Sequence, residues 1–366
     1  GSGFGAGTEI SVANITAGNL KFLGAANAFG SPYTSFTFQV RDNGGTANSG
    51  VDLDASANTM TINVTPVNDP PTADNDSLDF IGNTQLEVDQ DTARTPEALD
   101  TTPSTFGVLD GDSDPVEGDA IAVSSITVGA CTDNTGPTFD CTDAAIGTVN
   151  MATNGRFSFG PAAGDTGASE TFTYILTDNG TPAPASAAPA TVTLTRFERV
   201  WYVKNDAAAG NGTSSSPFNA ITAANLSDNA GDGDLTDDLD FANDYIFVHF
   251  GDGTSANQAA GLVLENGQHL IGDHAGLSIP VNLNANGSPT ALFAGTPGNR
   301  PLLDDTAVDA FEGVSAINVV PTEIVGMNLA GNVNGIDWNT TAAFAGTGTF
   351  TIRDNVIRSA AADGVD

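Results

Sequence analysis

The stretch that decides the fold is TFTYILTDNG, residues 171–180, in which Phe172, Tyr174 and Leu176 stand at every second position. Apolar residues at every second position are typical of a β-strand with one buried face. The Asp-Asn-Gly that follows is a turn signal, because Asn and Gly readily adopt positive φ. The stretch therefore predicts a half-buried strand that ends in a tight turn.

The same pattern occurs earlier in the chain. SFTFQVRDNG, residues 35–44, matches residues 171–180, and GNLKF, residues 18–22, matches GRFSF, residues 155–159, at an offset of 136 or 137 positions. Each copy closes with an alternating strand, at residues 61–65 and 191–195. Two copies that agree over several short strands, with turns between them and no helical periodicity, predict two β-sandwiches.

These motifs resemble a known group. FTFQVRDNGG, residues 36–45, and the run from Asn58 to Pro71 are similar to the cadherin-like and immunoglobulin-like repeats of giant bacterial surface adhesins. The second copy resembles them through Gly107-Val108-Leu109, the acidic loop after it and residues 172–180. The resemblance implies a partial repeat over 1–67, whose opening strands are expected upstream, and a second repeat over 68–197.

After Arg199 the sequence changes period. Brief apolar runs occur at residues 245–248, 269–272, 324–326 and 352–354. Ile271 and Val325 are 54 positions apart, which we interpret as two turns of about 27, and Ile324 and Ile352 are 28 apart. Short strands at this spacing predict the stacked coils of a parallel β-helix over residues 198–366, with further coils expected beyond them.

The start of this third region also carries a resemblance. Trp201-Tyr202-Val203, and Gly212-Thr213 through Pro217-Phe218, are similar to the N-terminal end of right-handed parallel β-helices of the pectate-lyase-like type. Residues 217–224 have helical spacing after a proline, so we expect a short helix that caps the column together with Trp201. The predicted fold class is all-β: tandem Ig/cadherin-like β-sandwiches followed by a right-handed parallel β-helix with a short capping helix.

The chain is strongly acidic, with a formal charge of −35 from 45 acidic and 10 basic residues. Such a surface repels nucleic acid and anionic lipid, so neither is an expected partner. No apolar run reaches the roughly 18 residues of a transmembrane helix. The acidity has two explanations, an adaptation to salty surroundings or specific Ca²⁺ sites.

One acidic run is DGDSDPVEGD, residues 110–119. Oxygen ligands at alternate positions of a tight loop can converge on Ca²⁺, although Pro115 at the sixth position rules out an EF-hand. The resemblance implies a calcium-stabilised loop in some members of the group, and a solvated acidic turn is the alternative. The candidate Ca²⁺ ligands are Asp110, Asp112, Asp114, Glu117 and Asp119.

Two further acidic clusters are weaker candidates for a Ca²⁺ site. The junction Asn68-Asp69-Pro70-Pro71, followed by residues 74–76, could gather Asp42 and Asp178 around a cation. Its prolines already stiffen a linker without metal. The Asp-rich stretch over 228–240 is predicted to be a solvated loop.

The chain has two cysteines, Cys131 and Cys141. A short-range pair in an Asp-rich chain of this kind favours a disulfide and a secreted protein, the alternative being two unrelated thiols.

Signs of catalysis are weak. Arg353, Asp354, Arg358 and Asp337 could form a lyase-like site on the last coils, yet isolated polar residues on outward positions are normal. Of the histidines His249, His269 and His274, the last two could share a metal, but they do not have the spacing of a helical pair, and surface imidazoles are favoured. Trp338, Phe344 and Phe350 suit a sugar-binding face or a core equally. The sequence predicts no enzyme.

The predicted function is a structural or adhesive extracellular module of a large bacterial surface protein, with calcium-assisted repeats that present a β-helix. The alternatives are a polysaccharide-binding or polysaccharide-degrading β-helix and a subunit of an extracellular filament or sheath. Expected partners are neighbouring repeats of the same polypeptide, glycans or host surface proteins, and further copies of the chain.

Overall fold

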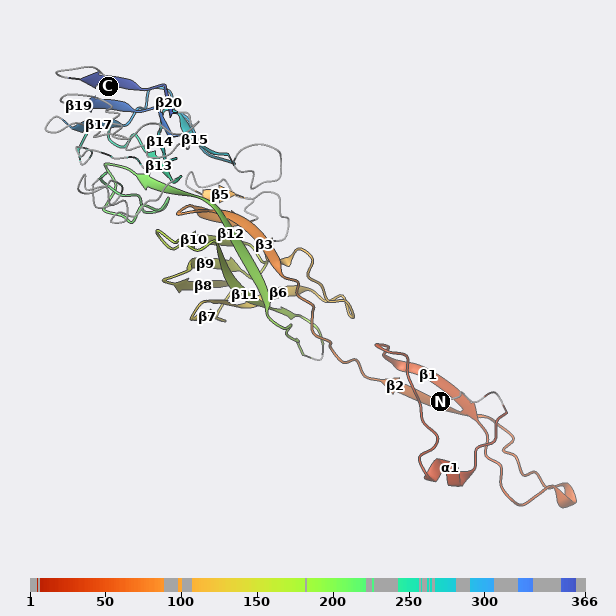
Figure 1. The fold of residues 1–366 in the computed structure, drawn as a ribbon. Coiled ribbons are helices and arrows are strands. Elements are labelled where there is room, and N and C mark those ends of the chain that lie inside the picture. Colours follow the sequence, from red (N-terminus) through yellow and green to blue (C-terminus); the bar gives the residue numbers. More distant parts are fainter. Residues whose placement is uncertain are drawn as a thin grey trace, which may run out of the picture.

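The computed structural model describes residues 5, 7–88, 98–100, 107–181, 183–221, 226, 243–256, 258, 262, 264, 267–280, 290–305, 322–331 and 350–359. The described chain is almost entirely β, as predicted, and its strands form several sheets (Figure 1). No helix among the described residues combines the length and the hydrophobicity of a transmembrane span.

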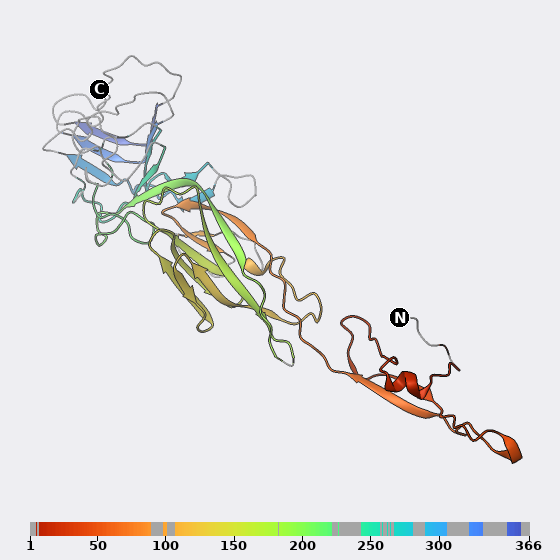
Figure 2. The ribbon, with the colours of Figure 1, turned by 60° about the horizontal axis from the view of Figure 1, so that its bottom comes forward.

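The first unit is an antiparallel hairpin of β1 (Gly30–Phe38) and β2 (Asn58–Val64), with a five-residue helix α1 (Val12–Thr16) and a 3-10 turn η1 (Ala47–Ser49). Figures 1 and 2 show that it stands apart from the other sheets, at the end of an extended segment. Its apolar side chains are exposed: Phe36 is 41% and Phe38 38% accessible.

The second unit consists of two sheets that enclose one core. One sheet has the order β5-β4-β10-β9-β8, and the other contains β7-β6-β11-β12, with β3 paired to β12. Phe157 of the first sheet meets Phe172 of the second edge to face, with ring centroids 5.3 Å apart. The strands are β3 (Asp76–Gly82), β4 (Gln85–Val88), β5 (Ala98–Asp100), β6 (Ile121–Val128), β7 (Cys131–Asp133), β8 (Thr138–Asp143), β9 (Gly147–Ala152), β10 (Phe157–Pro161), β11 (Ser169–Asp178) and β12 (Ala190–Val203), with a 3-10 turn η2 (Gly107–Leu109) before β6.

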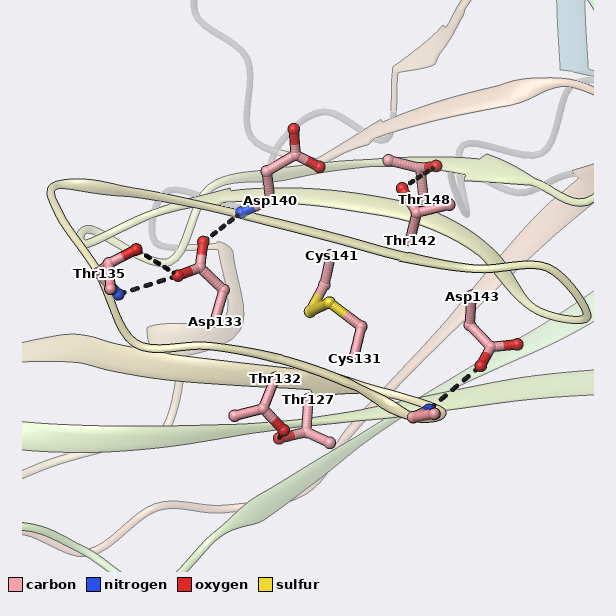
Figure 3. The surroundings of a disulfide bond; sticks show 11 residues. Thr127, Cys131, Thr132, Asp133, Thr135, Asp140, Cys141, Thr142, Asp143 and Thr148 are labelled. Carbon is pink, nitrogen blue, oxygen red and sulfur yellow. Dashed lines mark hydrogen bonds between the residues drawn. A yellow bond between two sulfur atoms is a disulfide. The ribbon is translucent and has the colours of Figure 1, made fainter.

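A disulfide joins Cys131 of β7 to Cys141 of β8, and the two strands belong to different sheets (Figure 3). Two aspartates brace the segment around it. Asp133 accepts hydrogen bonds from Thr135 and from the backbone of Asp140, and Asp143 accepts one from the backbone of Ala130. The disulfide therefore ties the edges of the facing sheets together.

Strand β12 runs from the second unit into the third without a break. Its first half pairs with β11 and β3, and its last four residues, 200–203, pair in parallel with β13 (Tyr245–Val248). The buried core continues as well, because Tyr202, Phe247 and Leu277 belong to the same apolar cluster as the core of the second unit. The boundary expected at 197/198 thus lies inside a strand.

The third unit contains two parallel ladders. One continues from β13 through β14 (His269–Gly272) and β18 (Thr322–Val325) to β20 (Phe350–Arg353). The other joins β17 (Leu302–Asp305), β19 (Asn328–Gly331) and β21 (Val356–Ser359). A separate antiparallel hairpin is formed by β15 (Gly276–Ile279) and β16 (Thr290–Ala294).

Of the two spacings read from the sequence, the 28-residue one is confirmed and the interpretation of the 54-residue one is wrong. Ile324 faces Ile352 and Leu329 faces Ile357 on neighbouring rungs, as the 28-residue period predicts. Ile271, however, pairs directly with Val325, so their 54 residues are one step of the ladder and not two turns. The intervening chain includes the β15–β16 hairpin, which lengthens this step.

The helix expected at residues 217–224 is not formed over residues 217–221, so this prediction is wrong for the described residues. Residues 217–221 are not helical, and Phe218 forms a parallel bridge with Val203; residues 222–224 lie outside the described part. The ring of Phe218 stacks on Trp201 at 5.7 Å. The apolar spacing that suggested a helix arises because Phe218 and Ile221 are both buried in the core that holds Trp201.

Candidate cation site

The acidic loop at residues 110–119 is divided by a strand-like contact. Thr72, in the linker between the first two units, forms an antiparallel bridge with Ser113, with N···O distances of 2.8 and 3.1 Å. Asp112 and Asp114 flank this bridge. The five candidate ligands are therefore not brought together at one point.

Asp112 belongs to a cluster around the Tyr174 hydroxyl. Its Oδ1 accepts a hydrogen bond from the backbone of Asp74 at 2.7 Å, and its Oδ2 lies 2.9 Å from the Tyr174 oxygen. The same hydroxyl lies 3.1 Å from Asp76 Oδ2 and 2.9 Å from the Val108 carbonyl. One phenolic proton thus faces several acceptors.

A second group, which we call the linker cluster, lies at the end of β11 that faces the first unit. It consists of Asn68, Asp114, Glu117, Asp119 and Asp178. It combines three of the predicted loop ligands with two residues of the predicted junction cluster. Asp110 stays exposed, and Asp42 lies on the remote hairpin, where it accepts a bond from the backbone of Gly44.

Asp178 is the anchor of the linker cluster. The side chain is 4% exposed, and its Oδ1 accepts hydrogen bonds from Asn68 Nδ2 and from the backbone of Gly180 and Ala185, all between 2.9 and 3.0 Å. Burial alone would raise the pKa of Asp178, but these bonds outweigh it and the pKa is lowered. Asp178 therefore carries a negative charge inside the fold.

The linker cluster has buried oxygen atoms without a hydrogen-bond partner in the part of the chain that the structure describes. They are Asn68 Oδ1, Asp114 Oδ2, Glu117 Oε2 and Asp178 Oδ2. Asp114 is 8% exposed, and its other oxygen accepts bonds from the backbone of Val116 and Glu117. Buried polar atoms are nearly always paired, so four unpaired oxygens on neighbouring side chains require an explanation.

The carboxylates of the linker cluster also repel one another. Burial raises the pKa of Glu117; a hydrogen bond from the backbone of Asp69 opposes this, and the charges of Asp114, Asp69 and Asp119 raise it further. A side chain at Gly180 would collide with Asn68 Oδ1 and approach Asp119 Oδ2, so glycine leaves room for both oxygens. None of these carboxylates forms an ion pair with Lys or Arg in the described part of the chain.

This donor set matches what a hard cation requires. Ca²⁺ takes carboxylate and amide oxygens, several at once and in flexible geometry. As the side chains stand, no group of three or more His, Cys, Asp or Glu in the described residues is placed so that it could hold a metal ion. The four carboxylates of the linker cluster therefore do not already surround one point, and a bound cation would have to draw them together.

Other sequence candidates are placed differently. Glu323 links the rungs of the third unit: its carboxylate contacts His269 Nδ1 at 3.2 Å and Arg353 at 3.0 Å. Arg353 also pairs with Asp354 at 3.5 Å. Asp337, Trp338, Phe344 and the acidic stretch 228–240 lie outside the described residues, as do the side chains of Phe350 and Arg358.

The remaining histidines do not share a site. His249 is half-buried beside Phe247 and Phe293, and burial lowers its pKa to about 4. His274 lies instead beside Arg300, at 2.7 Å. His269, in contrast, contacts Glu323, so the candidate pair His269 and His274 has separate partners.

The sequence interpretation missed two features of the site. It treated Tyr174 only as a core residue, although the matching position of the first copy is Phe38, which has no hydroxyl. It also separated the loop and junction clusters. Asp178 was expected beside the junction, and Asn68 does donate to it, but the approach of the loop acids to this pair was not expected.

No model of a protein family matches this chain, and no curated protein matches it.

Proposed function

We propose that the chain is a non-enzymatic, structural or adhesive extracellular module in which Ca²⁺ fastens a linker to an immunoglobulin-like domain that presents a parallel β-helix. The observation that carries the proposal is the linker cluster. Its unpaired oxygens come from the linker residue Asn68 on one side and from the loop and β11 of the second unit on the other.

Three features support the fold part of the proposal. The two facing sheets of the second unit, with their shared core, suit a cadherin-like or immunoglobulin-like sandwich. The two parallel ladders of the third unit suit the first coils of a β-helix. The internal repeat makes the hairpin of the first unit the counterpart of β11 and β12.

Calcium would be held by Asn68, Asp114, Glu117, Asp119 and Asp178. It would supply positive charge to carboxylates that repel one another and would pair the four unpaired oxygens. Because Asn68 belongs to the linker, the bound ion would restrict the angle between the first two units. A disulfide and a charge of −35 are consistent with a secreted protein on a bacterial surface.

The test compares the melting temperature of the chain with Ca²⁺, with Mg²⁺ and with chelator. We expect Ca²⁺ to raise it, because an ion that binds only the folded state stabilises that state by mass action. The variant Asp178→Asn, which has the same shape without the charge, should lose most of this increase.

The matched control is Asp252→Asn. Asp252 also accepts backbone and side-chain hydrogen bonds in a turn, from Thr254 and Asn205, but it lies in the third unit. This variant should keep the full response to Ca²⁺. A melting temperature that is the same in Ca²⁺ and in chelator would contradict the proposal.

A further inference from the structure

The first unit holds most of the exposed apolar side chains of the described chain. Of the 15 large hydrophobic residues that are exposed among the described residues, 13 lie between residues 12 and 67. The other two are Val116 and Phe197. A soluble monomer rarely exposes an apolar patch larger than a few hundred Å², so a concentration of this kind marks an interaction surface.

One face of the β1–β2 hairpin is apolar. Phe36 is the direct cross-strand partner of Met60, and the rings of Phe36 and Phe38 lie 6.4 Å apart. Successive side chains of a strand point to opposite faces, so these three residues share one face, which we call the open face. Thr37 and its partner Thr59 lie on the other face. The three residues of the open face are 38–48% exposed.

The second copy of the repeat shows how such a face is covered inside a sandwich. There Phe172, the counterpart of Phe36, meets Phe157 of β10. The counterpart of β10 in the first copy is the segment 18–22, which forms no strand. Its Phe22 is itself 48% exposed. The open face therefore has the pattern of a sandwich strand, and the matching segment of its own copy does not cover it.

Charge favours a second copy of the chain as the partner of this face. Residues 1–67 contain four acidic and two basic residues, a net charge of −2, and residues 68–366 contain the other 41 acidic and eight basic residues, a net charge of −33. The first unit also stands apart from the other sheets (Figures 1 and 2). Two copies that meet through their first units therefore keep their acidic parts away from each other, where salt screens the repulsion.

The first unit has the area that a stable dimer needs. At their exposed fractions the 13 side chains present roughly 1,000 Å² of apolar surface, since a large apolar side chain has an area of about 150–250 Å². A standard interface buries about 800 Å² on each partner. The second unit does not offer an equal match, because the outward side chains of β9 and β10 are polar, as at Thr148, Asn150 and Ser158.

We infer that the open face is a dimerisation surface, on which the β1–β2 hairpin of a second copy of the chain stacks face to face. Each hairpin then covers the other, as β10 covers β11 in the second unit, and a face that meets its own copy forms a closed two-fold pair. Among the described strands, β1 and β2 pair only with each other, whereas β11 and β12 have neighbours on both sides. The amides of the hairpin therefore stay less protected than those of β11 and β12 in the dimer as well.

The test is sedimentation velocity of the full chain between about 1 and 100 µM, a range that reports dissociation constants of this order. We expect a species of twice the 37.0 kDa chain mass as the concentration rises. Added salt should strengthen the dimer, because it screens the acidic parts from each other. The dimer should form in chelator as it does in Ca²⁺, which separates this result from that of the linker cluster.

Matched variants test the face. Phe36→Asp places a charge on the open face and should weaken the dimer by more than about tenfold, because the charge would be buried against an apolar partner. Thr37→Asp adds the same charge to the adjacent position on the polar face and should leave the dimer intact. Phe197→Asp is the control on an exposed phenylalanine of the second unit, and Phe36→Leu, which stays apolar, should still dimerise.

Hydrogen exchange of the parent chain needs no variant, so it keeps the inference testable if Phe36→Asp unfolds the hairpin. Peptides from β1 and β2 should exchange more slowly as the concentration passes through the dissociation constant, while those from β11 and β12 should not change. The inference is overturned by a monomer at every concentration, by assemblies that grow beyond a dimer, or by Thr37→Asp dissociating the dimer as readily as Phe36→Asp.

Discussion

Tyr174 and Asp76 belong to a cluster that has more hydrogen-bond acceptors than donors. The hydroxyl faces two carboxylates and two carbonyls but has one proton to donate. Burial raises the pKa of Asp76 to about 7; the bond to Tyr174 opposes this, and the charges of Asp112, Asp110 and Asp74 raise it further. A protonated Asp76 would supply the second hydrogen that this cluster lacks.

The pKa of Asp76 leads to a pH dependence of stability. Because the folded state binds this proton more tightly than the unfolded chain, the contribution is complete below the ordinary value of 3.8 and is lost as the pH rises through about 7. In chelator, the chain should therefore melt at a higher temperature near pH 5 than near pH 8. In Asp76→Asn this difference should become smaller.

The control for this prediction is Asp140→Asn, at an exposed position of β8. It should leave the pH dependence as it is. If Asp76→Asn melts with the same pH difference as the parent chain, the proton lies elsewhere in the cluster.

At the scale of elements, the disulfide connects two edge strands of different sheets. β7 and β8 lie at the margins of facing sheets, and β7 has only three residues. In the chain-entropy model a loop this short contributes about 2–3 kcal/mol, because the cross-link restricts the unfolded chain.

We therefore expect Cys131→Ser/Cys141→Ser to lower the free energy of unfolding by about 2–3 kcal/mol in urea titrations. Reduction of the parent chain should have a similar effect. Reductant added to the double variant should not change its free energy of unfolding. If the double variant is destabilised but reduction of the parent chain has no effect, the loss of stability comes from the packing of the substituted side chains and not from the cross-link.

The elements that could be predicted from the sequence are those with a local signal. Alternation predicted β11 and the strand that became β12, and short apolar runs predicted β13, β14, β18 and β20. Pairing could not be predicted in the same way. The direct contact of Ile271 with Val325 and the bridge of Phe218 to Val203 depend on contacts between segments distant in sequence.

The same limit applies to the candidate site. The loop at 110–119 was recognisable as acidic, and three of its side chains belong to the linker cluster. That Asp112 turns instead to Tyr174 depends on the bridge between Thr72 and Ser113, which brings the linker across the loop. Alternate spacing alone does not determine which acids share a partner.

At the scale of the whole molecule, the two copies of the repeat differ in their surroundings. Phe172 and Tyr174 are 2% and 0% exposed, whereas the matching Phe36 and Phe38 are 41% and 38% exposed. In the second unit a facing sheet covers these residues, and in the first unit none of the described residues does so. The sequence pattern is the same, but the packing that stabilises it is not.

Hydrogen exchange should separate the copies. Amides of β1 and β2 should exchange much faster than those of β11 and β12, because local stability follows buried apolar contact. Mass spectrometry of exchanged peptides from the parent chain compares matched sequences within one molecule. Equal protection in both hairpins would mean that the first unit is covered in solution, by another copy or by other parts of the chain.

The continuity of β12 has a mechanical consequence. β3 begins beside the linker, β12 ends in the third unit, and the two strands are parallel neighbours over six paired positions. Tension applied between the first and third units would pull them in opposite directions along their length. Their hydrogen bonds would then be loaded together in shear instead of being unzipped one at a time, so a pulling force would meet the cooperative resistance of the whole ladder.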